Sequence, residues 1–222
     1  MGRWRSSRRR TKTRGLHHLH SIKQTKYLRV TSVLLLICAF FLQSCANEEP
    51  TQFEFREAFV NGVRCYSFQS CRKDPDVAEI VIPESWNGLP VLRIEEYAFQ
   101  KAGSTQTVDI GAVEIISPKA FVFCSQLREV NLRNARIIGA GAFKGCSYIK
   151  SIIIPKTVEE IEGEAFASCT SLESIYFEGN PVLSGPLIFP GHSTIYGIPE
   201  GNVEAYAQHY GIPFVSWTPT LN

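Results

Sequence analysis

The sequence predicts a β-rich α/β solenoid of about four to five coils, built from repeats of 22–23 residues. An Ala-Phe dipeptide recurs at separations of 22, 22 and 23 residues, at Ala98-Phe99, Ala120-Phe121, Ala142-Phe143 and Ala165-Phe166. Each pair follows an isoleucine by four residues, and the last three are each followed by a cysteine. A period in the low twenties indicates one coil of a solenoid, because so short a unit must stack on the next to bury its apolar face.

Each coil is predicted to begin with a short strand. In the segment 149–154 the apolar residues Ile149, Ile152 and Ile154 alternate with others, as expected where one face of a strand is buried. Pro155 then ends the strand, because proline cannot donate to a continuing ladder of hydrogen bonds. Stacking such coils predicts ladders of like residues, namely phenylalanines, isoleucines and cysteines.

Both ends of the solenoid are predicted to be capped. Residues 53–68 alternate around Asn61-Gly62, a strong signal for a hairpin turn, and residues 53–76 form the N-terminal cap. The solenoid proper occupies 77–191. Residues 192–222 form the C-terminal cap, in which 201–211 reads as a short helix stopped by glycine, with Val203, Tyr206 and Tyr210 on one face. Caps are needed because bare end coils would expose the core.

The repeat resembles the BspA-type leucine-rich repeat family, whose pattern is L-x-x-I-x-I-P-x-x-V-x-x-I-x-x-x-A-F-x-x-C. The coil 149–169 matches this pattern almost throughout, and the similarity covers about residues 53–217. Gly111 and Arg133 depart from it, since they replace the proline, and the unit after Leu172 loses its Ala-Phe-Cys half. The resemblance implies a leucine-rich-repeat binding scaffold at the cell surface rather than an enzyme.

The N-terminal 44 residues are predicted to be a basic extension followed by a lipoprotein signal peptide. The apolar run 33–42 has ten residues, too few for a membrane-spanning helix and suited to the apolar core of a signal peptide. It ends in Leu42-Gln43-Ser44-Cys45, which resembles the bacterial lipobox and implies lipid attachment at Cys45. An ordinary secretory cleavage nearby is the alternative. Residues 45–52 would then be a tether, whose Glu48-Glu49 pair resembles a surface-export signal. We expect a lipid-anchored protein at the outer membrane or cell surface.

The basic extension does not predict nucleic-acid binding. The first 30 residues contain ten of the 23 Lys and Arg residues and no acid, which leaves 13 basic and 21 acidic residues, a net charge of −8, in 31–222. A nucleic-acid-binding arm is one interpretation. The preferred interpretation is a start site placed upstream of an ordinary signal peptide, near Ser21.

The sequence offers no convincing catalytic, metal or cofactor site. The recurring cysteines Cys124, Cys146 and Cys169 lack the close pairs that metal sites need, and we interpret them as small buried thiols. Cys65 and Cys71 are predicted to flank a short loop, and in an exported protein they could form a disulfide. His192 lies in a loop rich in glycine and proline, and His209 lies on the presumed cap helix; a lone surface histidine is usually only solvated. The sequence therefore predicts that the protein is not an enzyme.

A binding function would use the outward side of the repeat strands. Because core residues occupy alternate positions, the residues between them face outward. The predicted binding face therefore comprises Asp109, Glu129, Asn131, Ile153 and Tyr176. Apolar and aromatic anchors dominate interface energies, although outward strand residues are often merely good β-formers. We predict adhesion, or recognition of a protein or glycan ligand. The alternative is a non-adhesive structural or accessory subunit of an outer-membrane assembly.

Overall fold

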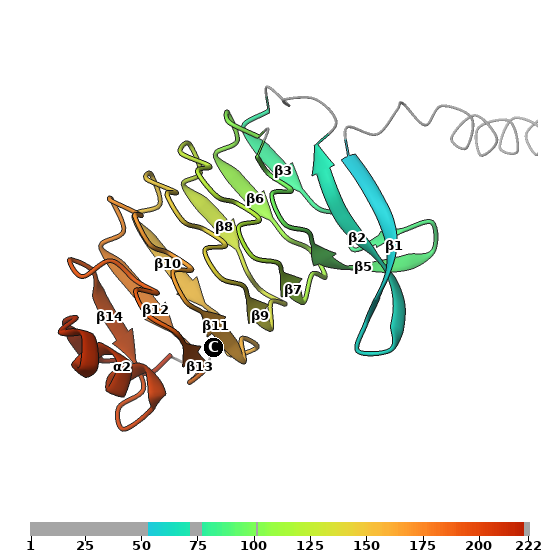
Figure 1. Cartoon of the computed structure of the whole chain (residues 1–222). Helices are drawn as coiled ribbons and strands as arrows, with labels where there is room; N and C mark the ends of the chain where they lie inside the picture. Colours follow the sequence, from blue (N-terminus) through green and yellow to red (C-terminus); the bar gives the residue numbers. More distant parts are fainter. Residues whose placement is uncertain (1–52, 72–76, 101, 220–222) are drawn as a thin grey trace, which may run out of the picture. The chain divides into compact units, whose positions relative to one another are not determined.

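The computed structural model describes residues 53–71, 77–100 and 102–219 and forms a solenoid of short, mostly parallel strands (Figure 1). One sheet has the order β1-β2-β5-β7-β9-β11-β13, with β4 paired to β5, and two smaller sheets, β3-β6-β8 and β10-β12-β14-β15, form a second side of the solenoid. The strands are β1 (Phe53–Val60), β2 (Val63–Cys71), β3 (Glu79–Val81), β4 (Ser85–Trp86), β5 (Leu89–Ile94), β6 (Thr107–Asp109), β7 (Ile115–Ile116), β8 (Glu129–Asn131), β9 (Ile137–Ile138), β10 (Ser151–Ile154), β11 (Glu160–Glu162), β12 (Ser174–Phe177), β13 (Val182–Ser184), β14 (Thr194–Gly197) and β15 (Phe214–Ser216), and the helix is α2 (Asn202–Tyr210).

Successive coils pair in parallel with the repeat register of the sequence. Ile152 of β10 lies opposite Ile175 of β12, and Ile153 lies opposite Tyr176. Within β10, Ile152 and Ile154 are buried whereas Ser151 and Ile153 are exposed. The predicted alternation of inward and outward residues is therefore confirmed for this strand.

A stack of phenylalanine rings forms the centre of the core. Phe68, Phe99, Phe121, Phe143, Phe166 and Phe189 are buried, and consecutive ring centroids lie between 4.2 and 5.5 Å apart in stacked orientation. The stack begins before the first Ala-Phe pair, with Phe68, and continues after the last, with Phe189. The core therefore extends one ring beyond the recurring dipeptide at each end.

The solenoid has about seven turns, more than the four to five predicted. The turns that the sequence did not predict lie mainly after Leu172, where the Ala-Phe-Cys half of the repeat is missing. There, Phe189 takes the place of the expected aromatic residue, and β14 and β15 continue the parallel pairing. Inward packing and backbone pairing alone sustain a coil, so the full sequence motif is not required for one.

The recurring cysteines are buried thiols, as predicted. Cys124, Cys146 and Cys169 donate to the carbonyl oxygens of Phe99, Phe121 and Phe143, at 3.5, 3.2 and 3.1 Å. Burial raises the pKa of Cys169 to about 12 and raises the pKa of Cys146 as well. These thiols therefore bind neighbouring coils together as neutral donors.

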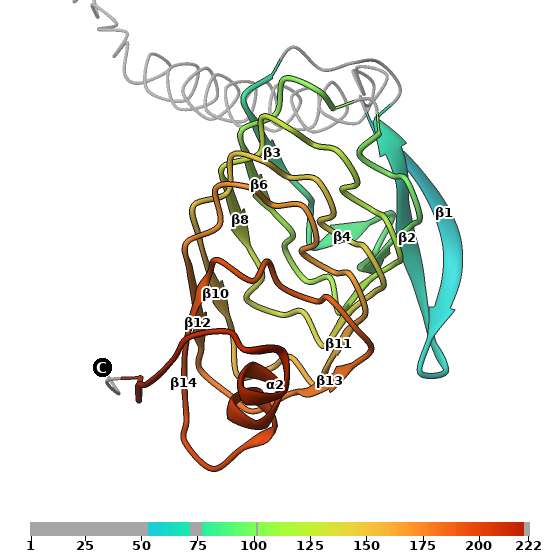
Figure 2. The ribbon, with the colours of Figure 1, turned by 60° about the vertical axis from the view of Figure 1, so that its left-hand side comes forward.

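The two predicted caps are present. Strands β1 and β2 pair antiparallel around Asn61 and Gly62, whose φ angles of 50° and 80° suit a tight hairpin turn, and β2 continues in parallel onto β5. At the other end α2 lies beside β13 and β14 (Figure 2). Its helical φ/ψ end at Gly211, which adopts the left-handed conformation with φ 66°.

The buried face of the cap helix differs slightly from the prediction. Val203 and Tyr206 are buried, as expected, but Ala207 is the third buried residue and Tyr210 is partly exposed. Tyr206 accepts a hydrogen bond from the backbone N–H of Ile188, at 2.8 Å, so the helix is fixed to the last coil by a polar contact as well as by packing. Within the described residues, no helix has the length and apolar character needed to cross a membrane.

Candidate functional site

The outward side of β3, β6, β8, β10, β12, β14 and β15, called here the strand face, has two unlike halves. Its N-terminal half (β3, β6, β8) presents two outward rows, Glu79-Thr107-Glu129 and Val81-Asp109-Asn131. Its C-terminal half (β10, β12, β14, β15) presents Ser151-Ser174-Thr194 and Ile153-Tyr176-Tyr196-Val215. The first half is mainly acidic and polar, and the second carries hydroxyl, apolar and aromatic groups.

The C-terminal half contains a cluster of large side chains, the aromatic patch, formed by Ile153, Tyr176, Tyr196, Val215 and Trp217. The rings of Tyr176 and Tyr196 stack with centroids 4.7 Å apart, and Trp217 meets Tyr176 edge-on at 5.5 Å. Ile153 is 57% exposed and Val215 is 44% exposed. The structure thus brings Ile153 and Tyr176 together, as the sequence predicts, and adds three neighbours.

Sequence reasoning missed Tyr196, Val215 and Trp217, because the repeat motif fades before them. A weaker signal was present, since Thr194-Ile195-Tyr196-Gly197 alternates as a strand with Ile195 inward. Trp217 lies after β15, and its backbone N–H donates to the carbonyl oxygen of Gly197 at 2.8 Å. This bond holds the tryptophan beside the outward row of tyrosines.

A hollow of about 400 Å³ lies between the two halves of the strand face. We call it the junction hollow; it separates β8 from β10, which belong to different sheets. Glu129 and Asn131 contribute from one half, Ile153 from the other, and Glu178 adds a further carboxylate. Three of the five predicted binding residues therefore surround one depression, with an apolar group on one side and acids at the edge.

Asp109 is engaged in a local network rather than oriented freely toward a partner. Its carboxylate accepts hydrogen bonds from the Arg133 guanidinium at 3.1 Å, the Asn131 amide at 3.3 Å and the backbone N–H of Gly111 at 2.8 Å. Arg133 stands where other coils have proline, and it also approaches Glu84 at 3.9 Å. This network ties consecutive coils of the N-terminal half together at its surface.

Lipid attachment cannot be placed on the described part of the chain, because Cys45 lies outside it. The expected Cys65–Cys71 disulfide is not formed. Both residues belong to the single strand β2, and Cys65 is a buried free thiol. Six residues of strand separate two Cα atoms by roughly 20 Å, whereas a disulfide needs less than about 7 Å. The sequence suggested a short loop, but the strand continues through both cysteines.

The acidic cluster around Ile161 has structural partners. Glu159 pairs with Arg136 at 2.7 Å, and Glu164 pairs with Lys144 at 2.5 Å. Glu160 accepts a hydrogen bond from the Ser184 hydroxyl, and Glu162 accepts one from the backbone N–H of Ala140. These carboxylates connect neighbouring coils and point to no shared proton-transfer site.

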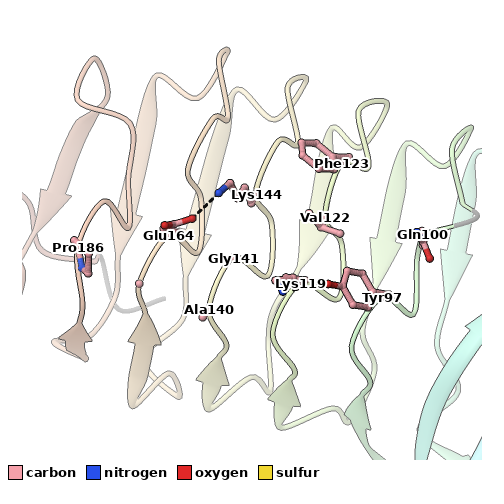
Figure 3. Close-up of a pocket in the computed structure, with 11 residues that line it drawn as sticks. Tyr97, Gln100, Lys119, Val122, Phe123, Ala140, Gly141, Lys144, Glu164 and Pro186 are labelled. Atoms are coloured by element: carbon pink, nitrogen blue, oxygen red, sulfur yellow. Dashed lines mark hydrogen bonds and ion pairs between the residues drawn. The ribbon is translucent and has the colours of Figure 1, made fainter.

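A second depression, the turn groove, lies along the turns that carry the Ala-Phe pairs (Figure 3). Its volume is about 800 Å³. The residue before each Ala-Phe pair has positive φ, with φ of 59° at Tyr97, 56° at Lys119, 61° at Gly141 and 60° at Glu164. Three of these four positions carry large side chains. Gly141 leaves a gap in the row, and the groove passes over it.

Charged and apolar groups alternate around the turn groove. Lys119 donates to the Tyr97 hydroxyl at 3.1 Å and lies 3.6 Å from Glu96, and the contact with Tyr97 raises the pKa of Lys119. Phe123 is 71% exposed beside the groove, and Val122 also lines it. This groove could not be predicted from the sequence, because a glycine within a repeat does not reveal that its neighbours leave a cavity.

Comparisons with known proteins agree with the architecture. The family model for the BspA type leucine rich repeat region matches residues 42–173 in six copies. No curated protein is significantly similar in sequence.

Two solved structures share the fold. One is a T. pallidum leucine-rich repeat protein, with 24% identity over 68% of this chain and 71% of the other and a TM-score of 0.59. The second is a leucine-rich repeat protein from Bacteroides ovatus, with 20% identity over 68% of this chain but only 43% of the other and a TM-score of 0.52. With its repeats, its stacked coils and this family match, the chain belongs to the BspA-type leucine-rich repeat family.

Proposed function

We propose that the chain is a lipid-anchored cell-surface binding protein that recognises a protein partner through the junction hollow and the aromatic patch. The observation that carries this proposal is the concentration of large apolar and aromatic side chains on one half of the strand face, where Ile153 and Val215 are exposed and Tyr176, Tyr196 and Trp217 are half-buried. Ile153, Tyr176 and Trp217 lie side by side there. Surface anchors of this kind, grouped beside a depression, are typical of interface hot spots.

A protein partner fits this surface better than a glycan. The rings of Tyr176 and Tyr196 stack on each other at 17°, so one face of each ring is already covered. This leaves less ring surface on which a sugar could stack. An apolar side chain of a partner can instead enter the junction hollow against Ile153, while a basic group meets Glu129 or Glu178.

A rigid scaffold reduces the entropic cost of such binding. Tyr176 and Tyr196 stand on β12 and β14, which are paired on both sides, whereas Ile153 stands on the edge strand β10. All three strands are backed by buried residues, namely Ile152, Ile175 and Ile195. A partner that docks there has few backbone segments to order, and preordered surfaces lose less conformational entropy on binding.

The anchor and the location are part of the same proposal. Leu42-Gln43-Ser44-Cys45 supports acylation at Cys45, with residues 1–44 removed as an extension and signal peptide and 45–52 serving as a tether. Adhesion to a surface outside the cell is the role that such an anchored scaffold would serve.

Anchoring is tested by labelling cells with a radioactive or clickable fatty acid. We expect wild-type protein to take up label and to sediment with membranes, whereas Cys45→Ser removes both properties. A wild-type protein that carries no lipid and yet stays with the membrane would contradict the anchor.

Recognition is tested by screening the purified full chain against extracellular matrix proteins and a glycan array. We expect saturable binding to at least one protein and no selective binding on the glycan array. Selective glycan binding would overturn the protein assignment. A stable complex with outer-membrane proteins of the producing cell, recovered by pull-down and without any external ligand, would favour the accessory-subunit alternative.

A further inference from the structure

The turn groove has features of a ligand site separate from the strand face. Gly141 interrupts a row of large side chains formed by Tyr97, Lys119 and Glu164, all with similar backbone geometry. A Cβ added at Gly141 would lie 3.6 Å from the Lys119 stem and 3.7 Å from the Lys144 stem, which are ordinary contact distances. The glycine is therefore not forced by crowding, and its missing side chain is what opens the groove at this point.

The groove is long and narrow. Its lining extends from Tyr97 through Lys119, Gly141 and Glu164 to Pro186, which lie on five successive coils. Four steps between coils at about 4.8 Å each give a length of roughly 19 Å. A volume of about 800 Å³ spread over this length suits an elongated molecule rather than a compact one.

The backbone of the groove is already hydrogen-bonded between and within coils. The N–H groups of Lys119, Gly141 and Glu164 donate to Ala140, Gly163 and Pro186 of the next coil. The N–H groups of Val122 and Lys144 donate within their own turns. An extended peptide in the groove would bring polar backbone groups that find few partners, and unpaired polar groups are costly to bury. A hydrocarbon body carries no such cost.

The residues that line the groove carry a net charge of +1, and each of the two lysines has a carboxylate near it. Two lysines, Lys119 and Lys144, and one acid, Glu164, line the groove. Glu164 already pairs with Lys144. An ammonium group has three donors, and Lys119 directs two of its interactions at Tyr97 and Glu96, which leaves capacity for an anionic head group.

We propose that the turn groove binds an elongated amphipathic organic anion, whose apolar body lies over Gly141 beside Val122 and Phe123 and whose single carboxylate meets Lys119. The ligand is taken as a free molecule from solution, not as part of a bilayer. This site is independent of the strand face, because the two surfaces share no lining residue.

The test uses dodecanoate below its micellar concentration, titrated into the full chain by calorimetry, with dodecanol as the neutral probe of equal chain length. Gly141→Tyr restores a large side chain like that of Tyr97 and should weaken dodecanoate binding about tenfold or more by filling the groove. Gly141→Ala is the matched control, since it adds the same Cβ in the same backbone conformation but leaves the groove open. We expect its affinity to stay within about threefold of wild type.

Lys119→Gln removes the positive charge of the groove and leaves Gly141 unchanged. It therefore tests the contribution of charge even if a glycine variant fails to fold. It should weaken dodecanoate about tenfold and leave dodecanol unchanged, because only the anion loses a partner. A Gly141→Tyr chain that is folded by circular dichroism and binds dodecanoate as well as wild type would overturn the proposal. Equal dodecanoate binding by Lys119→Gln and wild type would also overturn it, as would an absence of binding by wild type. Stronger binding to phospholipid vesicles than to free dodecanoate, lost in Gly141→Tyr, would overturn the choice of a free ligand.

Discussion

The two halves of the strand face share one interior and differ outside. Ile80, Val108, Val130, Ile152 and Ile175 occupy the same inward position in successive coils, and all are buried except Val130, which is half-buried. Outward, the N-terminal half carries Asp109 in a network with Arg133, whereas the C-terminal half carries the aromatic patch. The repeat therefore determines the inward residues that build the scaffold and leaves the outward residues free to vary, so we expect the functional residues among the outward ones.

The largest expected effect lies in the interior that both halves share. Phe143→Ala removes a fully buried ring from the middle of the phenylalanine stack, between Phe121 and Phe166. We expect a loss of about 3–5 kcal/mol in the free energy of unfolding, because the neighbouring coils cannot collapse into the cavity. Chemical denaturation followed by circular dichroism measures it.

The matched control for that prediction is Phe123→Ala, which removes an exposed ring from the same part of the fold. Its unfolding free energy should change by no more than about 0.5 kcal/mol. If the Phe143→Ala protein were as stable as the Phe123→Ala protein, the phenylalanine stack would not be a main source of the stability of the fold.

The next prediction concerns the turn of the N-terminal half in which Gly111 stands where other coils have proline. Gly111 has φ 61°, and a Cβ there would lie 2.5 Å from the carbonyl oxygen of Ile82. Gly111→Ala should cost about 2 kcal/mol, since both the backbone conformation and the contact become unfavourable. Gly191→Ala, where the added atom meets nothing within 4 Å, serves as the control and should be nearly neutral on thermal melting. Equal melting of the two variants would show that the turn at Gly111 relaxes freely.

A smaller effect concerns the thiol bonds between coils. Cys146→Ala removes a buried sulfur and its hydrogen bond to the Phe121 carbonyl oxygen, which also accepts from the backbone N–H of Cys124. Because that oxygen keeps one donor, we expect a cost of only about 1 kcal/mol in unfolding free energy. If Cys146→Ala lowered the unfolding free energy as much as Phe143→Ala does, the thiol hydrogen bonds would stabilise the stack of coils far more than we expect.

The smallest effect belongs to the outer surface of the N-terminal half. Arg133→Ala breaks the pair with Asp109, in which both side chains are partly exposed. Pairs of this kind contribute about 1 kcal/mol or less, and 0.5 M salt should reduce the difference from wild type further. Denaturation at low and high salt measures it. A salt-insensitive loss of several kcal/mol would contradict the view that outward residues are dispensable to the scaffold.

The central coils could be predicted from sequence because each repeats the same inward residues. Phe143, Cys146 and Ile152 recur at fixed offsets, and a fixed offset in a solenoid means a ladder. Asn61-Gly62 likewise identified the hairpin, because few other residue pairs accept positive φ at both positions. Local chemistry and periodicity were sufficient for these elements.

The features that the sequence did not predict depend on contacts that periodicity does not encode. Phe189 continues the stack without its alanine and cysteine, so the sequence underestimated the number of coils. Trp217 reaches Tyr176 only because β15 pairs with β14 after a helix has intervened. Cys65 and Cys71 seemed to flank a loop, but the pairing of β2 keeps the chain extended through both. Each case is set by long-range packing rather than by neighbours in sequence.

Recognition through the C-terminal half of the strand face is tested by comparing the affinities of two surface variants for the protein ligand found by screening. One is Ile153→Ser with Tyr176→Ser in the C-terminal half, and the other is Val81→Ser with Thr107→Ser in the N-terminal half. Val81 is 53% exposed, close to the 57% of Ile153, so the changes at these two positions remove apolar groups of similar exposure. We expect a loss of about 2 kcal/mol or more in binding free energy for the first variant and almost none for the second, with both melting like wild type. Equal affinities of the two variants would contradict it.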